Sequence, residues 1–484
     1  MAECGCVTIM TRRFLCISLH FSAFSFLGCT GNDVDGFSDE RSFRSRPALD
    51  GGAAAVEQEV RFIGYGDQDW DEPGSVQTAA LALRDVVSGG YDHFLLHFGD
   101  LSYGEGDVSD WDHWATQVEP YASRVPYLVS FGNHEYNYVH GKWKDQTLLP
   151  MRRPAQPRRG DTTGVGHRDD GGSFAPAGGD YGSDSNGECG IAMVHRFRAP
   201  SNGRPNRQGS LAWYSFDYGA VHVVQMSSEH DWTEGSDQHA WLEADLTAAA
   251  GNRIRTPWIV VTAHRMMYST QVRAQATPSQ KQRSVNFACA CGWVGVRERG
   301  YLEVRVASGG DDPACAGRLM RAVHWCIARI AARRPFVPSL WQTQLCEEPD
   351  YDTSLIFRRH VEPLLLKYKV NVVMVGHQHS YERSCAVRNG TCIDAASAEG
   401  AILPSRGAVD HEQPHGVVHI TAGSAGAGVE HCGFDTTGAH GNFSRVQSNQ
   451  WGYLRGRATR SRFTVEFVSD ALGTVWDQVA LVKV

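Results

Sequence analysis

The sequence lacks a sustained run of basic residues. It has 46 Lys and Arg against 54 Asp and Glu, which gives a formal net charge of −8. Nucleic-acid-binding domains carry clustered positive charge, so this balance argues against a nucleic-acid partner. Beyond the N-terminal region, the chain also lacks a stretch that approaches a membrane span in length and apolar content. No serine or cysteine nucleophile motif is evident. The chemistry must therefore be sought among other side chains.

The N-terminal region has the pattern of a secretory signal. Arg12 and Arg13 precede an apolar run over 14–27, and small residues follow at 28–30. A basic segment, a short apolar segment and small residues are the three parts of such a signal. We predict a signal peptide over 1–30, a polar linker over 31–60 and a secreted, extracellular or vacuolar protein. The alternative is a mis-started gene model.

From residue 60 onward, segments with strand and helix patterns alternate. The predicted strands are 61–65, 93–98, 127–131, 211–218, 221–226, 258–262, 370–375, 417–422, 463–470 and 475–484. The predicted helices are 75–88, 110–118, 236–249 and 355–368. Alternation followed by a β-rich end predicts an α/β layered sandwich. Residues 139–185 interrupt the pattern with many Gly, Pro and Arg, and we interpret them as a long loop insertion.

Five of these strand-like segments end in side chains that bind metals. The residues are Asp67, Asp100 with Tyr103, Asn133, His264, and His377 with His379. Any one of them is more often an ordinary turn residue or a core histidine. Five such ends in one chain make that explanation poor, because carboxylate, amide, imidazole and phenol groups together suit a two-metal site. The carboxylate of Asp100 can bridge two ions, and a phenolate at Tyr103 favours a trivalent ion.

The five segments resemble the sequence blocks of a known family. Those blocks are GDxG, GDxxY, GNH[E/D], VxxH and GHxH, and the chain matches them at 66–69, 99–103, 132–135, 261–264 and 376–379. On these residues the chain resembles a purple acid phosphatase of the metallophosphoesterase superfamily, over most of 61–480. The resemblance implies an α/β fold, a layered αββα sandwich with mixed sheets, whose catalytic domain spans 61–484.

The resemblance also implies roles for individual residues. The ferric-site ligands would be Asp67, Tyr103 and His379. The ligands of the divalent site, which holds Zn, Mn or Fe, would be Asn133, His264 and His377. Asp100 would bridge the ions, and His134 would contact phosphate and help protonate the leaving group.

The implied activity is hydrolysis of small phosphate monoesters by hydroxide generated at an Fe(III)–M(II) centre. One alternative is a metallophosphoesterase that acts on diesters or pyrophosphates. The others are a non-catalytic secreted binding protein and a misassembled gene product that never folds. The sequence does not indicate the oligomeric state.

The chain departs from the family pattern in several places. Asp69 replaces the second Gly of the first block, and Met266 stands where many relatives have Pro. The paired substrate histidines of some plant members are not evident. Arg265 is therefore the candidate for a second phosphate contact, with a surface salt bridge as the alternative. Residues 1–60 are too few for the N-terminal β-sandwich of large plant members.

Residues 272–344 differ in composition from the surrounding sequence. They contain ten Arg and one Lys against four acidic residues, and four of the thirteen cysteines. We interpret them as an anomalous insertion, with a retained intron as the favoured explanation. A metal knuckle formed by Cys289, Cys291, Cys315, His324 and Cys326 is the alternative, but its spacing is poor for zinc. Only 319–332 has helical spacing.

Two further features suit a secreted protein. Cys385 and Cys392 bracket a turn, which predicts a hairpin disulfide. Asn389 and Asn442 each begin an Asn-x-Ser/Thr sequence, so both are predicted glycosylation sites.

Overall fold

The computed structural model describes a large part of the chain. The described ranges are 59–136, 190–199, 211–272, 348–393, 416–428 and 441–483, with short strands and single residues elsewhere. The predicted 139–185 loop lies, apart from Ser185, outside the described residues. Most of 272–344 also lies outside them.

One large mixed sheet has seven strands in the order β19-β25-β24-β23-β6-β7-β8. Their bounds are β19 Val409–Glu412, β25 Thr474–Val482, β24 Arg462–Ser469, β23 Gly452–Ala458, β6 Val60–Tyr65, β7 Phe94–His97 and β8 Tyr127–Val129. Strands β6, β7 and β8 are parallel to one another. The pairs β6–β23, β23–β24 and β24–β25 are antiparallel, and β19 is parallel to β25. The carboxyl ends of the three parallel strands therefore meet at one edge.

The second large sheet has the order β18-β17-β20-β16-β11-β10-β9, with β22 paired to β17. Their bounds are β18 Thr391–Cys392, β17 Tyr381–Arg388, β20 Val417–Ala422, β16 Val372–Val375, β11 Trp258–Thr262, β10 Val221–Gln225, β9 Tyr214–Tyr218 and β22 Ser444–Ser448. Strands β10, β11, β16 and β20 are parallel, and each is fully buried. Such continuous apolar strands are typical of sheets covered on both faces.

Helices α2 (Pro73–Val87) and α3 (Val108–Ala122) belong to the first half of the chain, and α5 (Asp237–Gly251) and α7 (Glu348–Lys367) to the second. Their starts follow from local chemistry. Pro73 occupies the first turn of α2, where a missing N–H costs nothing. The Asp107 side chain accepts a bond from Ser109 N at 2.8 Å, and Ser236 accepts one from His239 N at 3.2 Å. These are N-caps of α3 and α5. A short helix, α4 (Ile191–Arg196), follows the loop region.

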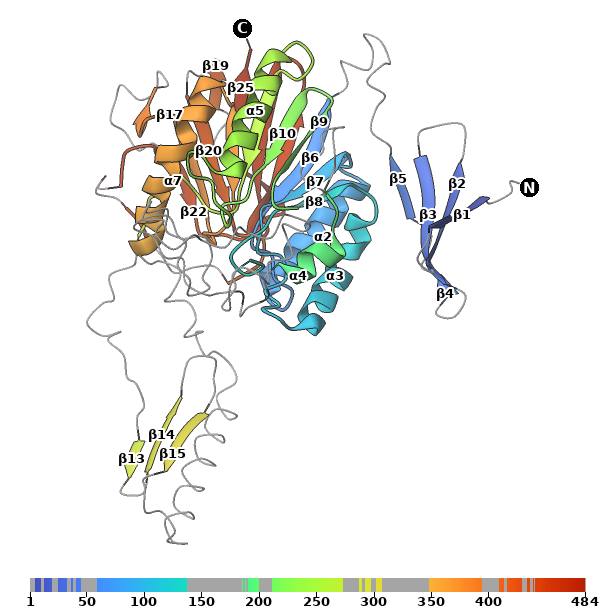
Figure 1. Cartoon of the computed structure of the whole chain (residues 1–484), viewed down its shortest axis with the longest axis vertical. Helices are drawn as coiled ribbons and strands as arrows, with labels where there is room; N and C mark the ends of the chain where they lie inside the picture. Colours follow the sequence, from blue (N-terminus) through green and yellow to red (C-terminus); the bar gives the residue numbers. More distant parts are fainter. Residues whose placement is uncertain are drawn as a thin grey trace, which may run out of the picture. The chain divides into compact units, whose positions relative to one another are not determined.

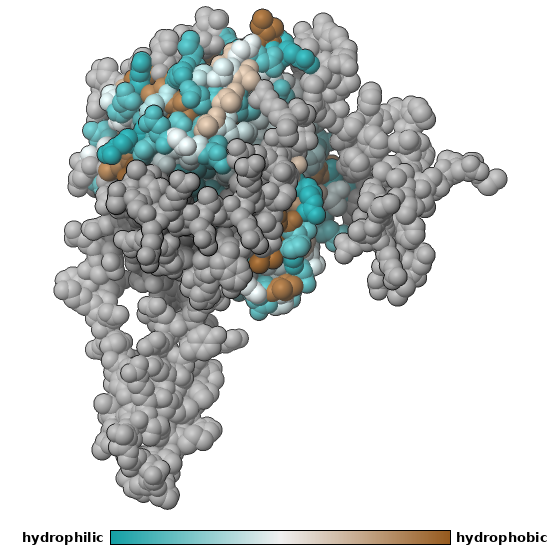
Figure 2. Space-filling model, viewed as in Figure 1, coloured by the Kyte–Doolittle hydropathy of each residue, from teal (hydrophilic) through white to brown (hydrophobic). Residues whose placement is uncertain are grey.

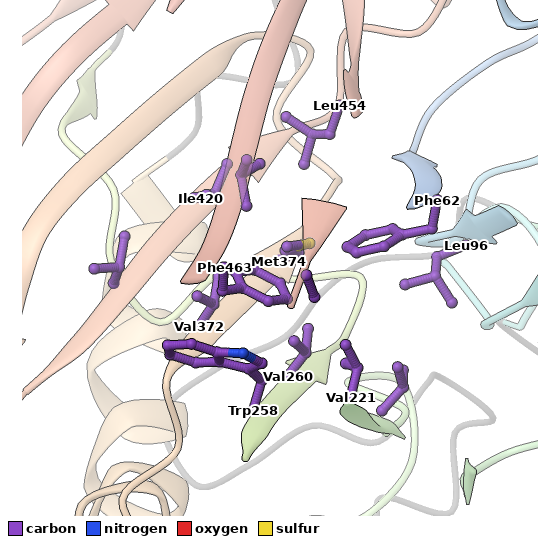
Figure 3. Packing of buried hydrophobic residues seen from close by; sticks show 14 of the residues in the cluster. Phe62, Leu96, Val221, Trp258, Val260, Val372, Met374, Ile420, Leu454 and Phe463 are labelled. Carbon is purple, nitrogen blue, oxygen red and sulfur yellow. The ribbon is translucent and has the colours of Figure 1, made fainter. Parts of the chain in front are cut away.

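Three buried clusters show how these elements are layered. The first contains side chains of both large sheets, including Phe62, Leu96, Val260 and Ile420. Figure 3 shows these side chains pointing toward one another from strands of the two sheets. The second cluster joins β6 and β7 to α2 and α3, and the third joins β10, β11 and β16 to α5 and α7. Figure 1 shows the helices outside the sheets. The predicted αββα sandwich is confirmed.

Every predicted strand and helix has a counterpart, with ends that shift by a few residues and a start of α7 seven residues earlier, at Glu348. Among the strands of the two large sheets, β17, β18, β19, β22 and β23 were not predicted. Strand β23 contains Gly452, Arg455, Gly456 and Arg457, so its sequence lacks the apolar signal of a central strand. The packing of Gly456 against the Phe62 ring explains the glycine, because a side chain would overlap that ring.

Other parts of the chain form separate small sheets. Strands β1 to β5, within residues 5–44, make one sheet, and β13 (Phe287–Cys289), β14 (Gly292–Val296) and β15 (Leu302–Val306) make another. The chain divides into two compact units, and the smaller one contains 271–347 with 430–433. None of the described helices is both long and apolar enough to cross a membrane.

Few large apolar side chains are exposed among the described residues. Exposed large apolar side chains in the described part include Val87, Val108, Ile254 and Leu472. Figure 2 shows the apolar residues of the visible face as small spots among hydrophilic ones. Scattered exposed apolar residues are normal for a globular protein.

The predicted disulfide and glycosylation sites lie on the β17–β18 hairpin and just before β22. A disulfide joins Cys385 and Cys392, with the two Cα atoms 5.7 Å apart. Asn389 is exposed at the turn, with φ 49°, and Asn442 is exposed near the start of β22. Both asparagines are therefore accessible, and their glycosylation stays a prediction.

A buried histidine should make stability depend on pH. His222 on β10 contacts Asp217 through Nδ1 (2.6 Å) and Asp245 through Nε2 (2.8 Å). Burial lowers the pKa of His222, but the two carboxylates outweigh this effect and raise the pKa to about 9. A raised pKa means that the folded state binds this proton more tightly than the unfolded state. The resulting stability is complete below about pH 6.5 and is lost as the pH rises through about 9.

We therefore expect the free energy of unfolding of the wild type to fall by roughly 1–3 kcal/mol over this window, relative to His222→Gln. Urea unfolding of both proteins at several pH values measures the difference. His195→Gln, which removes an exposed histidine, is the control and should follow the wild type. Parallel curves for wild type and His222→Gln would contradict the prediction.

Candidate metal centre

The carboxyl ends of five parallel strands bring the predicted ligands together. Asp67 follows β6, Asp100 and Tyr103 follow β7, and Asn133 follows β8. From the second sheet, His264 follows β11, and His377 and His379 follow β16. Backbone bonds tie the turns to one another: Asp67 N donates to Gly99 O at 3.2 Å, and Gly376 N donates to His264 O at 2.9 Å. Ligand sites at this edge are typical of open α/β sheets.

Four of these residues adopt left-handed backbone conformations. Their φ angles are 62° at Asp67, 51° at Asp100, 50° at Tyr103 and 69° at His377. Only eight non-glycine residues in the described part have positive φ, so half of them are predicted ligands. Such conformations cost energy and cluster at functional sites. The backbone here is set by the site rather than by local preference.

The first donor group contains three side chains at nearly equal distances. Asn133 Oδ1 lies 2.9 Å from His264 Nε2 and 2.9 Å from His377 Nδ1, and the two ring nitrogens are 3.2 Å apart. Asp100 Oδ2 lies 3.1 Å from His264 Nε2. Ligands of one tetrahedral ion are about 3.3 Å apart when each bond is about 2.0–2.1 Å. The spacing therefore fits a single ion.

The second donor group has the same form. Tyr103 Oη lies 2.8 Å from His379 Nε2 and 3.3 Å from Asp67 Oδ1, and the last two atoms are 3.5 Å apart. The two groups match the division into ferric and divalent ligands that the sequence resemblance implies.

Backbone carbonyls orient two of the imidazoles. His264 Nδ1 lies 2.8 Å from Phe98 O, and His379 Nδ1 lies 2.8 Å from Gly428 O. A carbonyl can only accept, so Nδ1 carries the proton and Nε2 presents its lone pair to the donor group. Metal-binding histidines are commonly held in this way.

Glu135 supports the centre, and the sequence analysis assigned it no role. Its carboxylate accepts bonds from Asp100 N (2.8 Å), Leu101 N (2.7 Å) and Gly132 N (2.9 Å). It therefore joins the turns that carry Asp100 and Asn133. Burial, with the nearby charge of Asp100, raises the pKa of Glu135 to about 8. Its place directly after Asn133-His134 was the available sequence signal.

The electrostatics of the centre favour a cation. Burial raises the pKa of Asp100, but His264 and then His134 outweigh it and hold the pKa far below its usual range. Burial lowers the pKa of His264, yet Asp100 raises it to about 9. Burial and the charge of Asp67 raise the pKa of Tyr103 well above 10. A strong cation is needed to convert this phenol to a phenolate.

His134 lies at the edge of the donor groups. Its N–H donates to Asp100 Oδ1 at 3.0 Å, and its Nδ1 lies 3.1 Å from Glu105 Oε1. Its side chain is 14% exposed, compared with 0% for His264. A partly exposed imidazole beside buried ligands can meet a substrate.

Arg265 is buried, with only 3% of its surface exposed, so the alternative of a surface salt bridge is wrong. Its Nε lies 3.0 Å from Glu229 Oε1, and its Nη1 lies 3.0 Å from His377 Nε2. A buried guanidinium is expensive unless a carboxylate neutralises it, and Glu229 does so here. Glu229 had no sequence signal, because it follows an unremarkable run of serines.

The chemistry of the donor set fits two ions. It offers three imidazole nitrogens, two carboxylates, one amide oxygen and one phenol, and Asp100, His264 and His377 present ligand atoms within 4.8 Å of one another. Gly99, with φ 90°, leaves room for the site, since a Cβ there would lie 2.7 Å from His264 Nδ1. Imidazole, carboxylate and amide suit Zn, Mn or Fe, and phenolate suits Fe(III).

Comparisons with known proteins agree with this site. The family described as "Calcineurin-like phosphoesterase" matches residues 61–291. The family described as "Iron/zinc purple acid phosphatase-like protein C" matches residues 416–478. The first match covers the strands that precede Asp67, Asp100, Asn133 and His264, and the second covers the closing strands β20, β22, β23 and β24. Strand β16, which precedes His377 and His379, lies between the two matched ranges.

Individual relatives cover most of this chain. An Arabidopsis thaliana protein named "Probable inactive purple acid phosphatase 9" is 27% identical over 476 residues, which is 93% of this chain and 53% of that protein. A Hordeum vulgare protein named "Nucleotide pyrophosphatase/phosphodiesterase" is 24% identical over 469 residues, 94% of this chain and 92% of that protein. The chain spans about half the length of four Arabidopsis relatives.

A solved structure shares the fold. The purple acid phosphatase from yellow lupin (Lupinus luteus) seeds has a TM-score of 0.58 and 21% identity, covering 95% of this chain and 59% of the lupin chain. With the sandwich, the family matches and these relatives together, the chain is similar to the purple acid phosphatase-like metallophosphoesterases.

Proposed function

We propose that this chain is an acid phosphatase that hydrolyses phosphate monoesters at a binuclear centre of Fe(III) and Zn, Mn or Fe(II). The observation that supports the proposal is the pair of three-residue donor groups beside Asp100. Asp67, Tyr103 and His379 would hold the ferric ion. Asn133, His264 and His377 would hold the divalent ion, and Asp100 would bridge the two.

When bound, the two ions would supply Lewis-acid activation of water and neutralise charge on the phosphate. Substrate contact and proton transfer would depend on side chains of the protein. His134 stands at the edge of the site, held by Glu105, where it can contact the ester and give a proton to the leaving oxygen. Arg265 would offer the second phosphate contact, with its Nε donating a hydrogen bond to Glu229.

A second candidate function rests on one comparison. The Hordeum vulgare relative matches over nearly its whole length and is named a nucleotide pyrophosphatase/phosphodiesterase. Diester or pyrophosphate hydrolysis is therefore the alternative activity. The name "probable inactive" on an Arabidopsis relative supports a third, non-catalytic alternative. A side chain able to bind a metal stands at each of the seven ligand positions, which favours a catalytic site.

A substrate panel separates the three. Purified full chain, loaded with iron and zinc, would be given p-nitrophenyl phosphate, bis-p-nitrophenyl phosphate and inorganic pyrophosphate at acidic pH. We expect the highest kcat/KM for the monoester, loss of activity with a chelator and recovery on adding metal. Faster hydrolysis of the diester or of pyrophosphate would favour the second candidate. Full metal content without hydrolysis of any of the three would favour the non-catalytic one.

The proposal includes secretion and glycosylation. The apolar run over 14–27 and the exposed Asn389 and Asn442 support it. N-terminal sequencing and glycosidase treatment of the protein from its native source would test it. An uncleaved N-terminus and unchanged mass would oppose it.

A further inference from the structure

A chain of buried hydrogen bonds joins α3 to the strands that carry Asp67 and Asp100. It runs through Trp114 Nε1, the Gln68 amide, the hydroxyls of Tyr121, Tyr65 and Tyr127, and His97 Nδ1. The successive distances are 3.1, 3.0, 2.9, 3.0 and 2.8 Å. Tyr65 and His97 also make an edge contact, with ring centroids 4.8 Å apart. The proposed function assigns no role to any of these six side chains.

The chain of bonds has one direction. The indole of Trp114 can only donate, so the Gln68 oxygen accepts and the Gln68 NH₂ donates to Tyr121. Each phenol has a single hydrogen. Every hydroxyl hydrogen finds an acceptor only when Tyr121 donates to Tyr65, Tyr65 to Tyr127, and Tyr127 to His97. His97 Nδ1 is then the acceptor, and the proton of this imidazole lies on Nε2.

His97, the last residue of this series of hydrogen bonds, lies on the strand that leads into the Asp100 turn. His97 is completely buried, and burial lowers its pKa to about 3, so the ring is neutral at ordinary pH. The groups that oppose this lowering most are the charge and the backbone of Asp100. No acceptor in the described part of the chain reaches hydrogen-bond geometry with Nε2. His97 is the last residue of β7, three residues before Asp100, so its ring is fixed to the strand that leads into the Asp100 turn.

Gln68, near the start of this series of hydrogen bonds, adjoins the turn that carries Asp67. Gln68 directly follows Asp67, and its backbone N–H donates to Asp100 O at 3.2 Å. A displacement of the Gln68 side chain or of His97 would therefore move one ligand turn relative to the other. We propose that this bonded chain sets the spacing between Asp67 and Asp100, and that Tyr127 and His97 are its positioning residues. The inference rests on the proposed metal centre.

Tyr127→Phe tests the inference, because it removes the hydroxyl that joins Tyr65 to His97 and keeps the ring. Full-length protein stripped with a chelator would be titrated with Zn²⁺ alone. Supporting groups around metal ligands typically change affinity by about 10- to 100-fold, and we expect a loss of about 10-fold. Tyr453→Phe is the matched control, since it removes the hydroxyl of a buried tyrosine, bonded to Asp85 at 2.6 Å, outside the site. We expect its Zn²⁺ affinity to equal that of the wild type.

A second measurement needs no metal and does not require Tyr127→Phe to fold. In ¹⁵N-histidine-labelled wild type, the His97 ring should show a protonated Nε2 and an unprotonated Nδ1, with His97→Gln identifying the signal. A proton on Nδ1 would overturn the inference. So would an unchanged Zn²⁺ affinity in folded Tyr127→Phe, which leaves the proposed function intact. A wild type that takes up no Zn²⁺ would overturn the proposed function and this inference with it.

Discussion

Asp100→Asn is expected to lower kcat/KM for a phosphate monoester by about a thousandfold, because a bridging carboxylate contributes several kcal/mol, here taken as about 4 kcal/mol, to holding and using two ions. The variant keeps the size of the side chain. Asn also tolerates the left-handed backbone at this position, where φ is 51°. The lost activity would therefore reflect the missing charge rather than a disrupted turn. Metal analysis after purification should show less than two ions per chain.

The control for this variant is Asp85→Asn. Asp85 is also buried, and it accepts bonds from Tyr453 and Arg84, but it lies on α2 outside the donor groups. It should lose some stability and keep its metal and its turnover. Near-normal activity in Asp100→Asn, with both ions retained, would rule out a bridging role for Asp100.

Tyr103→Phe is expected to abolish visible absorption of the iron-loaded protein. A phenolate bound to Fe(III) absorbs visible light by charge transfer, and the side chain of Phe cannot supply it. In the protein without metal, burial and the charge of Asp67 keep this phenol protonated by raising its pKa. The colour would therefore appear only on binding of a strongly acidic ion. The visible spectrum, recorded together with iron content, measures the effect.

Some hydrolysis should remain in Tyr103→Phe, because the other ligands of its group, Asp67 and His379, are still present. Tyr91→Phe is the control, since Tyr91 contacts Glu466 away from the centre. A wild type with full iron and no visible band would contradict the role of Tyr103. A band that survives in Tyr103→Phe would contradict it equally.

The fold was predictable where pattern and chemistry coincide. Strands β6, β7, β11 and β16 are short apolar runs, and an Asp or His follows each of them. The apolar run indicated a buried strand, and the Asp or His indicated a ligand at its end. Strand β17 is not an apolar run, because it contains Glu382 and Arg383, although most of it is buried. Arg383 is paired with Asp477 of β25 at 2.7 Å, a partner about ninety residues away that no local pattern indicates.

The clustering of the proposed ligands was predictable from the sequence, and the residues that support them were not. The ligands lie in compact blocks such as 99–103 and 376–379, where spacing carries the information. Glu135, Glu229 and His97 act through backbone groups or through other side chains, and only the folded chain brings these partners into contact. Arg265 was placed on the surface in one alternative because its partner, Glu229, lies 36 residues earlier in the chain.

The left-handed turns at Asp67 and Asp100 have a consequence for how this protein would evolve. In the absence of metal, each turn carries a conformation that costs a non-glycine residue about 1 kcal/mol. Asp67→Gly would remove this cost at the first turn, whereas at Asp100 the contacts with His264 and His134 offset it. Selection for heat tolerance alone should therefore remove the Asp67 carboxylate first. Lineages released from selection for catalysis would lose the centre while their scaffold became more robust.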